Sequence, residues 1–313
     1  SRSKNITAIK SSKEFIEEAL DSLEESPEDT TWAGLTSKTD SHDGYLEKHE
    51  PSPDERANLV KDFVNEGKDM NAAGYCSTYI NNFFIWNTNG LNSTDTSSSA
   101  FIDGIFRTDT SAGSSHRGSV DIKDLDAAQT GHEAASLAID SQNPVDIDPG
   151  KYEVILGHEA VSTILVFLSV YGLNAKSKID GMSPILINEK QFDEKITLID
   201  TPEDDESIGF KIDASGAKKH NLEVIKNGIP NTFFHTRRTS KELNMENTYH
   251  ELFGWGDNFG GIATNLELSK GNTSHGDMIS SVKKGIFINE FWYCRVLDPI
   301  TQVVTGLNRN GSF

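Results

Sequence analysis

The chain has 313 residues, of which 35% are hydrophobic and 25% charged, and its formal net charge at pH 7 is −19. This length and composition suit one large or two medium globular domains with a sizeable core. The acidic excess argues against nonspecific binding to DNA or to anionic membranes, since both attract lysine and arginine. Cys76 and Cys294 lie too far apart in sequence for a CxxC metal site.

The first half of the chain mixes helical and strand patterns. Apolar spacing and breaker residues predict helices at 12–23, about 54–66 and 122 to about 141. Strands are predicted at 72–80, 83–87 and 100–108. Asn89-Gly90 is a hairpin signal before the third strand. The Ser-, Thr- and Gly-rich segments 94–99 and 110–118 are predicted to be loops.

The stretch from Lys151 to Gly172 combines a short strand with a helix. Val154–Leu156 is apolar and β-branched at its start, Gly157 breaks it, and a helical period follows. Because apolar side chains fill most of the remaining helical positions, this helix is predicted to be buried nearly all round.

The second half is mostly β. Strands are predicted at 185–188, 195–200, 222–226, 231–235 and 266–268, with a hairpin formed by 286–297 and 302–307. Short helices are predicted at 239–243 and 274–283. The glycine- and aromatic-rich segment 253–261 is a candidate flexible or ligand-facing loop.

Two His-Glu pairs raise the question of a metallopeptidase. A zinc helix of the HExxH type places a second histidine one turn after the first, with Glu as general base. His158-Glu159 is followed there by Ser162, and His132-Glu133 by Ser136. The other interpretation is that each Glu lies in or near the first turn of a helix, where the helix dipole favours it. A metal site would then need a distant partner such as His235, His250 or Asp257.

Several segments resemble the TldD/TldE (PmbA) peptidase family. They are Ala72–Tyr75, Tyr152–Leu156, Asn265–Leu268 with Lys270-Gly271, and Gly285–Thr301. The ending Thr305–Phe313 is similar to the family pattern Thr-Gly-x-x-Arg-Asp-Gly-x-Phe, with Asn310 in place of the Asp. The resemblance runs from about Phe15 to Phe313.

The resemblance implies an α+β fold and a division into two regions. Residues 1–148 would be the remnant of an N-terminal domain plus a middle region of helices and a strand meander. Residues 149–313 would be a C-terminal domain rich in antiparallel strands. Compared with the family, most of the N-terminal domain and a final C-terminal segment are expected to be missing. The family also implies dimers around an enclosed cavity.

The resemblance also bears on the zinc site. The TldD branch carries HExxxH on the helix after the strand that Val154–Leu156 resembles, with a late cysteine as a further ligand. A gap-free alignment puts Val166, Phe167 and Tyr171 at the His, Glu and His positions. Cys294 does not take the late ligand position. The chain therefore resembles the TldE/PmbA branch, which implies no metal ligands here and zinc in a TldD-type partner.

The main functional hypothesis is a subunit of a TldD/TldE-type peptidase that completes a cavity for linear or unfolded peptide. Its partner would be a TldD-type subunit or a second copy, and the family is linked to peptide maturation and to modulation of DNA gyrase. Candidate cavity residues are Trp255, Phe259 and Trp292. The alternatives are a self-sufficient zinc metallopeptidase using His158 and Glu159, or a non-enzymatic peptide-binding scaffold. No signal peptide or membrane-length apolar run is seen, so a cytoplasmic location is expected.

Overall fold

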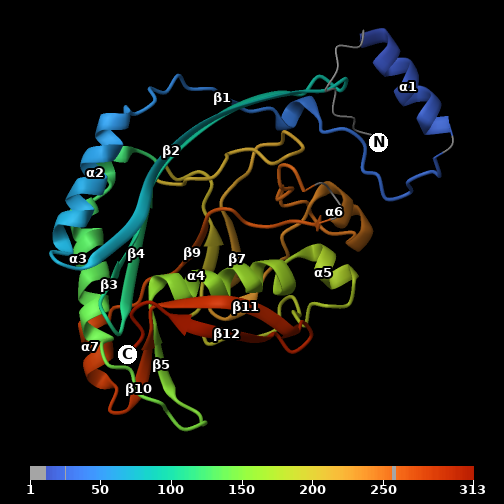
Figure 1. The fold of residues 1–313 in the computed structure, drawn as a ribbon. Helices are drawn as coiled ribbons and strands as arrows, with labels where there is room; N and C mark the ends of the chain where they lie inside the picture. Colours follow the sequence, from blue (N-terminus) through green and yellow to red (C-terminus); the bar gives the residue numbers. More distant parts are fainter. Residues whose placement is uncertain (1–11, 25, 256–258) are drawn as a thin grey trace. The chain divides into compact units, whose positions relative to one another are not determined.

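The computed structural model describes residues 12–24, 26–255 and 259–313, and the chain divides into two compact units, residues 1–34 and 35–313 (Figure 1). In the first unit, helix α1 spans Ser12–Glu24, as its amphipathic pattern predicts. All the elements that follow belong to the second unit.

The first layer of the second unit is an antiparallel sheet with two helices. Its strands are β1 (Asp43–Gly44), β2 (Asn71–Trp86), β3 (Asn92–Arg107) and β4 (Ala112–Ser119). The central strand β3 pairs with β2 on one side, and on the other with β4 and, in parallel, with β1. Helices α2 (Pro53–Glu66) and α3 (Ala127–Asp140) lie beside this sheet (Figure 1). Where α2 meets the sheet, the rings of Phe63 in α2 and Phe106 in β3 stack at a centroid distance of 5.0 Å.

Local signals account for where these helices begin. Ser52 and Glu55 form a capping box at the start of α2, with Pro53 in its first turn. Asp126 caps α3 by accepting from the Gln129 amide, so the regular helix starts later than the predicted residue 122. Gly113 of β4 is required by close packing, because a Cβ there would lie 2.2 Å from the carbonyl oxygen of Ala134 in α3.

Three predictions for this layer were wrong. The predicted strands 72–80 and 83–87 are extended through Trp86, but the break predicted between them is absent and both belong to β2. Segment 94–99 lies inside β3, and segment 110–118 lies largely in β4. The reason is pairing with neighbours: β2 and β3 are paired at every position from Asn71 to Trp86. Ladder hydrogen bonds along a whole strand outweigh the weak β-propensity of serine, asparagine and glycine.

The helix predicted after Gly157 is present, but it is not buried all round. Strand β5 (Glu153–Leu156) leads through Gly157 into α4 (His158–Phe167), which continues as a π-helix over Leu168–Gly172. Ile164 and Val166 are 41% and 55% exposed. The prediction of full burial was wrong: Val161, Leu165 and Val166 line a cavity, and Ile164 is exposed without lining it.

The remaining strands surround α4. Four of them form an antiparallel sheet in the order β8 (Ile229–Pro230), β7 (Leu222–Lys226), β6 (Leu198–Asp200), β9 (Leu266–Leu268). Strand β10 (Gly285–Ile288) pairs in parallel with β5, and β11 (Glu290–Asp298) forms a hairpin with β12 (Val303–Arg309). The helices are α5 (Ala175–Ile179), α6 (Arg237–Leu243) and α7 (His275–Ser281).

Some strand predictions in this half were also wrong. Residues 185–188 and 231–235 form no strand, and of 195–200 only Leu198–Asp200 is one. Asn188 has a φ of 66°, which breaks extended pairing, while the Ile196 amide closes a turn onto the carbonyl of Asp193. The mixed α+β fold is confirmed, and the division at residues 148 and 149 stays a prediction. Among the described residues, every helix is too short or too polar to cross a membrane.

Candidate functional site

A cavity of about 1150 Å³ runs along α4 in the second unit. Its walls come from β4, α3, α4, α7 and β10, together with the segment that leads into β9. The apolar part of the lining consists mainly of Leu156, Val161, Leu165, Val166, Leu266, Leu268, Met278, Ile279, Phe287 and Phe313. A large concave surface of this kind, mostly apolar with a few polar groups, is the usual form of a ligand site.

A cluster of titratable side chains lies where α4 begins. Gly157 is the N-cap of α4, so His158 and Glu159 fall in its first turn, as the sequence predicts. His116 of β4 reaches across and forms an ion pair through Nδ1 with Glu159 Oε1. His158 Nε2 lies 3.5 Å from the same carboxylate oxygen. Two imidazoles thus flank one largely buried carboxylate.

The charge states of this cluster follow from its contacts. Burial alone would raise the pKa of Glu159, but hydrogen bonds to His116 and His158 outweigh it and lower the pKa to about 2. The hydrogen bond to Glu159 in turn raises the pKa of His116 above its usual value of 6.5, against the effect of burial. Glu159 is therefore a carboxylate at neutral pH, and it favours the imidazolium form of His116.

A second ion pair stands next to the first. Arg117 Nη2 donates to both carboxylate oxygens of Glu133 in α3, at 2.6 Å each, and Ser115 donates to the same group at 3.0 Å. Arg117 Nη1 also lies 3.4 Å from His158 Nε2, which links the two pairs. Glu133 lies in the second turn of α3, so its role is to pair with β4 rather than to stabilise the start of the helix.

Sequence reasoning missed His116 and Arg117. Both lie in segment 110–118, which is rich in serine and glycine and was predicted to be a loop. Neighbouring residues of a strand point to opposite faces. His116 therefore pairs with Glu159, and Arg117 pairs with Glu133. The only signal available in the sequence was that a metal site at His158-Glu159 would need another histidine from elsewhere in the chain.

Asn289, between β10 and β11, ties the end of the chain to this site. Its side-chain amide donates to the carbonyls of Ser114 at 3.1 Å and Asn310 at 2.9 Å. Asn310 donates in turn to Glu290, whose pKa is raised by burial. An aspartate at position 310, as in the family pattern, would instead set a second carboxylate against Glu290. The departure from that pattern is thus matched by its surroundings.

The three positions aligned with HExxxH lie on α4 and its π-helical extension. Val166 lines the cavity, and the rings of Phe167 and Tyr171 stack at a centroid distance of 6.2 Å. Histidines five residues apart in a regular α-helix point about 140° away from each other. In the π-helix over 168–172, the Leu173 amide donates to the Leu168 carbonyl, five residues earlier. This wider turn brings residues five apart toward the same face of the helix.

These three residues do not fit a zinc ion. Valine and phenylalanine side chains have no donor atom, and zinc in proteins is bound by Cys, His, Asp or Glu. In the described part of the chain, no three or more His, Cys, Asp and Glu side chains are arranged as a metal-binding group.

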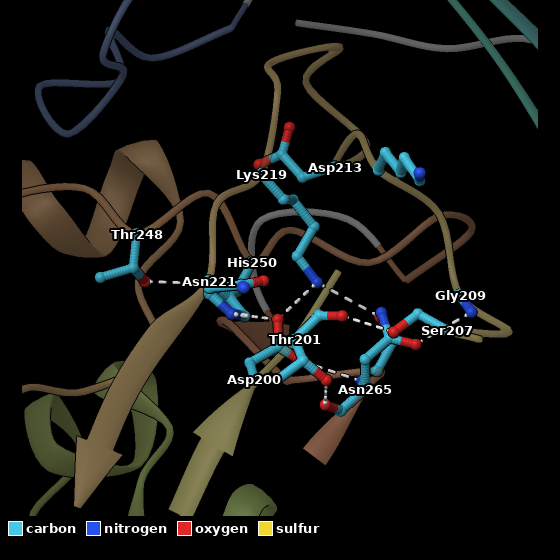
Figure 2. A network of polar contacts seen from close by, with 12 residues as sticks. Asp200, Thr201, Ser207, Gly209, Asp213, Lys219, Asn221, Thr248, His250 and Asn265 are labelled. Atoms are coloured by element: carbon cyan, nitrogen blue, oxygen red, sulfur yellow. Dashed lines mark hydrogen bonds and ion pairs between the residues drawn. The ribbon is translucent and has the colours of Figure 1, made fainter. Parts of the chain in front are cut away.

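The histidines considered as distant partners belong to a different network. His250 Nε2 lies 3.1 Å from Asp200 Oδ2, which also forms an ion pair with Lys219 Nζ at 2.9 Å (Figure 2). All three side chains are almost fully buried. His235 is also buried, and its Nδ1 contacts Thr239 at 3.3 Å. Asp257 lies outside the described residues. The histidine that does meet Glu159 is His116, which the sequence did not suggest.

The aromatic candidates are in contact with other side chains. Trp255 and Phe259 contact each other at a centroid distance of 4.7 Å. Trp292 of β11 lies under the guanidinium of Arg309, 4.3 Å from its ring centroid. None of the three is among the lining residues of the large cavity. Their contact with peptide stays a prediction.

Solved structures of similar fold cover most of the chain. TldE from Thermococcus kodakarensis matches 89% of this chain and 67% of its own, with a TM-score of 0.72 and 20% identity. Two proposed modulators of DNA gyrase each match 96% of this chain. The one from Thermotoga maritima has a TM-score of 0.71 and 20% identity over 72% of its length. The one from Bacteroides thetaiotaomicron has a TM-score of 0.77 and 17% identity over 73% of its length.

Sequence comparisons point the same way. A protein named Metalloprotease from Methanothermobacter thermautotrophicus is 23% identical over 170 residues, or 54% of this chain. The match covers 36% of that relative, so the chain spans about a third of its length. The family model described as the PmbA/TldA metallopeptidase C-terminal domain matches residues 149–312. Since this match covers more than half of the sequence, the chain belongs to the PmbA/TldD metallopeptidase family.

Proposed function

We propose that this chain is the subunit without zinc ligands of a two-subunit TldD/TldE-type peptidase. Its role is to complete the cavity in which a linear or unfolded peptide is held, while zinc and the hydrolytic step belong to a TldD-type partner. The proposal includes action in the cytosol, without direct binding to nucleic acid or membrane. The net charge of −19 supports the last point.

The observation that carries the proposal is the face that α4 turns to the cavity. Val166, which the gap-free alignment puts at the first zinc histidine, lines the cavity beside Val161 and Leu165. The π-helix that suits a five-residue ligand spacing is present, but the aligned side chains are apolar or aromatic. The cavity face of the helix is therefore suited to apolar contact and not to binding zinc.

The rest of the cavity suits a peptide. Apolar side chains from α4, β9 and α7 cover much of its lining, and the charged pair Arg117–Glu133 belongs to the same lining. An extended peptide needs apolar contacts for its side chains and polar groups to fix its direction. Because Arg117 and Glu133 form an ion pair, they leave no excess charge of either sign between them.

The test is metal content and peptide cleavage, measured on the purified chain alone and after co-expression with a TldD-type homologue. We expect no stoichiometric zinc and no cleavage for the chain alone. The co-purified complex should contain zinc and cleave a linear peptide faster than the homologue alone. Stoichiometric zinc and activity in the single chain would overturn the proposal and favour His158, Glu159 and His116 as a metal site. A complex no more active than the homologue would favour a scaffold.

Two lysine variants on α4 provide a matched control. Val166 and Ile164 are both exposed, but only Val166 lines the cavity. In the active complex, Val166→Lys should raise KM for an apolar peptide roughly tenfold, which corresponds to about 1.4 kcal/mol. Ile164→Lys should leave KM within about twofold. Equal effects of the two variants would contradict a peptide in this cavity.

A further inference from the structure

Ser169 is a buried serine in the wall of the large cavity. It lies in the π-helix that continues α4, it is 2% exposed, and it belongs to the cavity lining. In the part of the chain that the structure describes, no group forms a hydrogen bond with its Oγ. Buried hydroxyls are nearly always hydrogen-bonded, because an unpaired one loses its bonds to water without replacement. An unpaired hydroxyl in a cavity wall therefore points to a partner that enters the cavity.

The π-helix explains why Ser169 lacks the partner that helical serines usually find. A serine or threonine hydroxyl within an α-helix commonly donates to the carbonyl four residues earlier. Thr163 does so in α4, where its Oγ1 lies 3.2 Å from the carbonyl oxygen of Glu159. From Leu168 onward the turn is wider, since the Leu173 amide donates to the Leu168 carbonyl. Within this wider turn, Ser169 forms no such bond.

The neighbours of Ser169 limit the kind of group that can meet its hydroxyl. Leu165 and Val166, four and three residues earlier, line the same cavity. An ionised group placed beside these apolar side chains and one neutral hydroxyl would lose its water without compensation. A neutral amide loses less, and a serine hydroxyl can donate to its carbonyl or accept from its N–H. The backbone of a peptide carries such an amide at almost every residue.

We propose that Ser169 forms a hydrogen bond with one backbone amide of the bound peptide and so sets the position of the peptide along α4. The inference rests on the proposed peptide-binding role of the cavity and adds to it a residue that fixes the register of the peptide. Apolar contacts are non-directional, so the apolar lining accepts a peptide at many positions. A hydrogen bond has a preferred length and direction, so a single buried hydroxyl favours one of them.

Ser177 in α5 provides a matched control. It is buried to a similar degree, at 4% exposed, and its Oγ donates to the carbonyl of Val170 at 2.7 Å. It does not belong to the cavity lining. Ser177 thus has its partner within the chain, whereas Ser169 gains its partner from the ligand. The two alanine variants should therefore differ both in stability and in peptide binding.

Urea unfolding of the purified chain tests the state without ligand. Ser177→Ala should lower the urea midpoint, because the buried carbonyl of Val170 loses its donor. Ser169→Ala should leave the midpoint unchanged or raise it, since it removes a hydroxyl without a partner and alanine favours the helix. A midpoint lowered as much in Ser169→Ala as in Ser177→Ala would show that the hydroxyl is bonded within the chain, and would overturn the inference.

Cleavage of a capped peptide of alanine and leucine, by the complex with a TldD-type homologue, tests the bound state. Ser169→Ala should raise KM roughly fivefold with kcat nearly unchanged, because one hydrogen bond in the bound peptide is lost. Ser177→Ala should leave KM within about twofold. If Val166→Lys raises KM and Ser169→Ala does not, only this inference fails. If neither variant changes KM, the proposed peptide site fails as well.

Ester analogues of the same peptide identify the group that Ser169 meets. An ester in place of one amide removes the N–H and leaves a weaker carbonyl acceptor. In wild type, one ester position should raise KM more than the others. In Ser169→Ala this extra effect should disappear, while the smaller effects at the other positions remain. A hydroxyl that bonds only to water would give the same pattern of KM values in both proteins, which would contradict the inference.

Discussion

Asp200 is a fully buried carboxylate with three polar partners. It accepts a hydrogen bond from the Asn265 amide at 2.8 Å, pairs with Lys219 at 2.9 Å and faces His250 at 3.1 Å (Figure 2). Burial would raise its pKa, but His250 and Lys219 together hold the pKa well below its usual range. This network joins the end of β6 to two loops and to the start of β9, so we assign it a structural role.

The first prediction concerns this ion pair. Asp200→Asn should lower the free energy of unfolding by about 3–5 kcal/mol, because it leaves the Lys219 ammonium buried without a counter-charge. Urea unfolding at pH 7 measures the loss. Asp205→Asn, on a fully exposed carboxylate 3.8 Å from Lys211, should change the same quantity by less than about 0.5 kcal/mol. A loss below about 1 kcal/mol for Asp200→Asn would show that water or another group compensates Lys219.

At the scale of elements, the ion pair between His116 and Glu159 joins β4 to the first turn of α4. The lowered pKa of Glu159 means that its contribution to stability is present above pH 4.5 and is lost as the pH falls toward 2. The raised pKa of His116 means that its contribution is present below pH 6.5 and is lost as the pH rises through the folded value. The pair therefore stabilises the contact most between about pH 4.5 and 6.5.

A second prediction follows for His116. In Glu159→Gln the pKa of His116 should fall below its wild-type value, because the hydrogen bond and charge that raise it are gone while burial still lowers it. An NMR titration of the imidazole measures this. In Glu133→Gln, which removes the carboxylate paired with Arg117, the pKa of His116 should remain raised. An unchanged His116 pKa in Glu159→Gln would mean that the ion pair does not form in solution.

Elements whose signals are local were predicted well. The capping residue Ser52 and the following Pro53 mark the start of α2, and the apolar period after Gly157 marks α4. Strands were predicted poorly wherever a neighbouring strand decides their extent. Residues 94–99 have a loop-like composition, yet all of them pair with β2, and Thr94 and Asp95 pair with β1 as well. Strand pairing joins residues distant in sequence, so no local pattern reports it.

The same distinction explains the candidate site. His158 and Glu159 are adjacent in sequence and were identified from it, whereas His116 reaches them only because β4 pairs with β3 beside α4. The exposed side of α4 could not be predicted either, since the helix is apolar on nearly every face. Which face meets the core and which lines a cavity depends on β9, α7 and β10.

At the scale of the whole molecule, buried histidines make stability depend on pH. Burial lowers the pKa of His235 from 6.5 to about 4, with a further contribution from the charge of His250. Burial also lowers the pKa of His250. Because the folded state binds these protons less readily than the unfolded chain, both contributions are present above pH 6.5 and are lost as the pH falls.

The third prediction is therefore a loss of global stability in mild acid. For His235 alone, the lowering from 6.5 to about 4 corresponds to about 3 kcal/mol between pH 7 and pH 4. Urea unfolding at both pH values measures the loss in wild type. His235→Asn should show a loss smaller by about that amount, while His220→Asn, at an exposed position, should behave like wild type. Equal losses in all three proteins would assign the acid sensitivity to other groups.

The parallel pairing of β5 with β10 has a consequence for the order in which the protein is made. Glu153 pairs with Gly285, so β5 and the helix that follows it leave the ribosome long before their partner strand. The layer of β2, β3, β4 and α3 is by then complete, because its contacts are local in sequence. The cavity gains its last walls, α7, β10 and Phe313, only as synthesis reaches this end of the chain. The cavity is thus completed after the layer of β2, β3, β4 and α3.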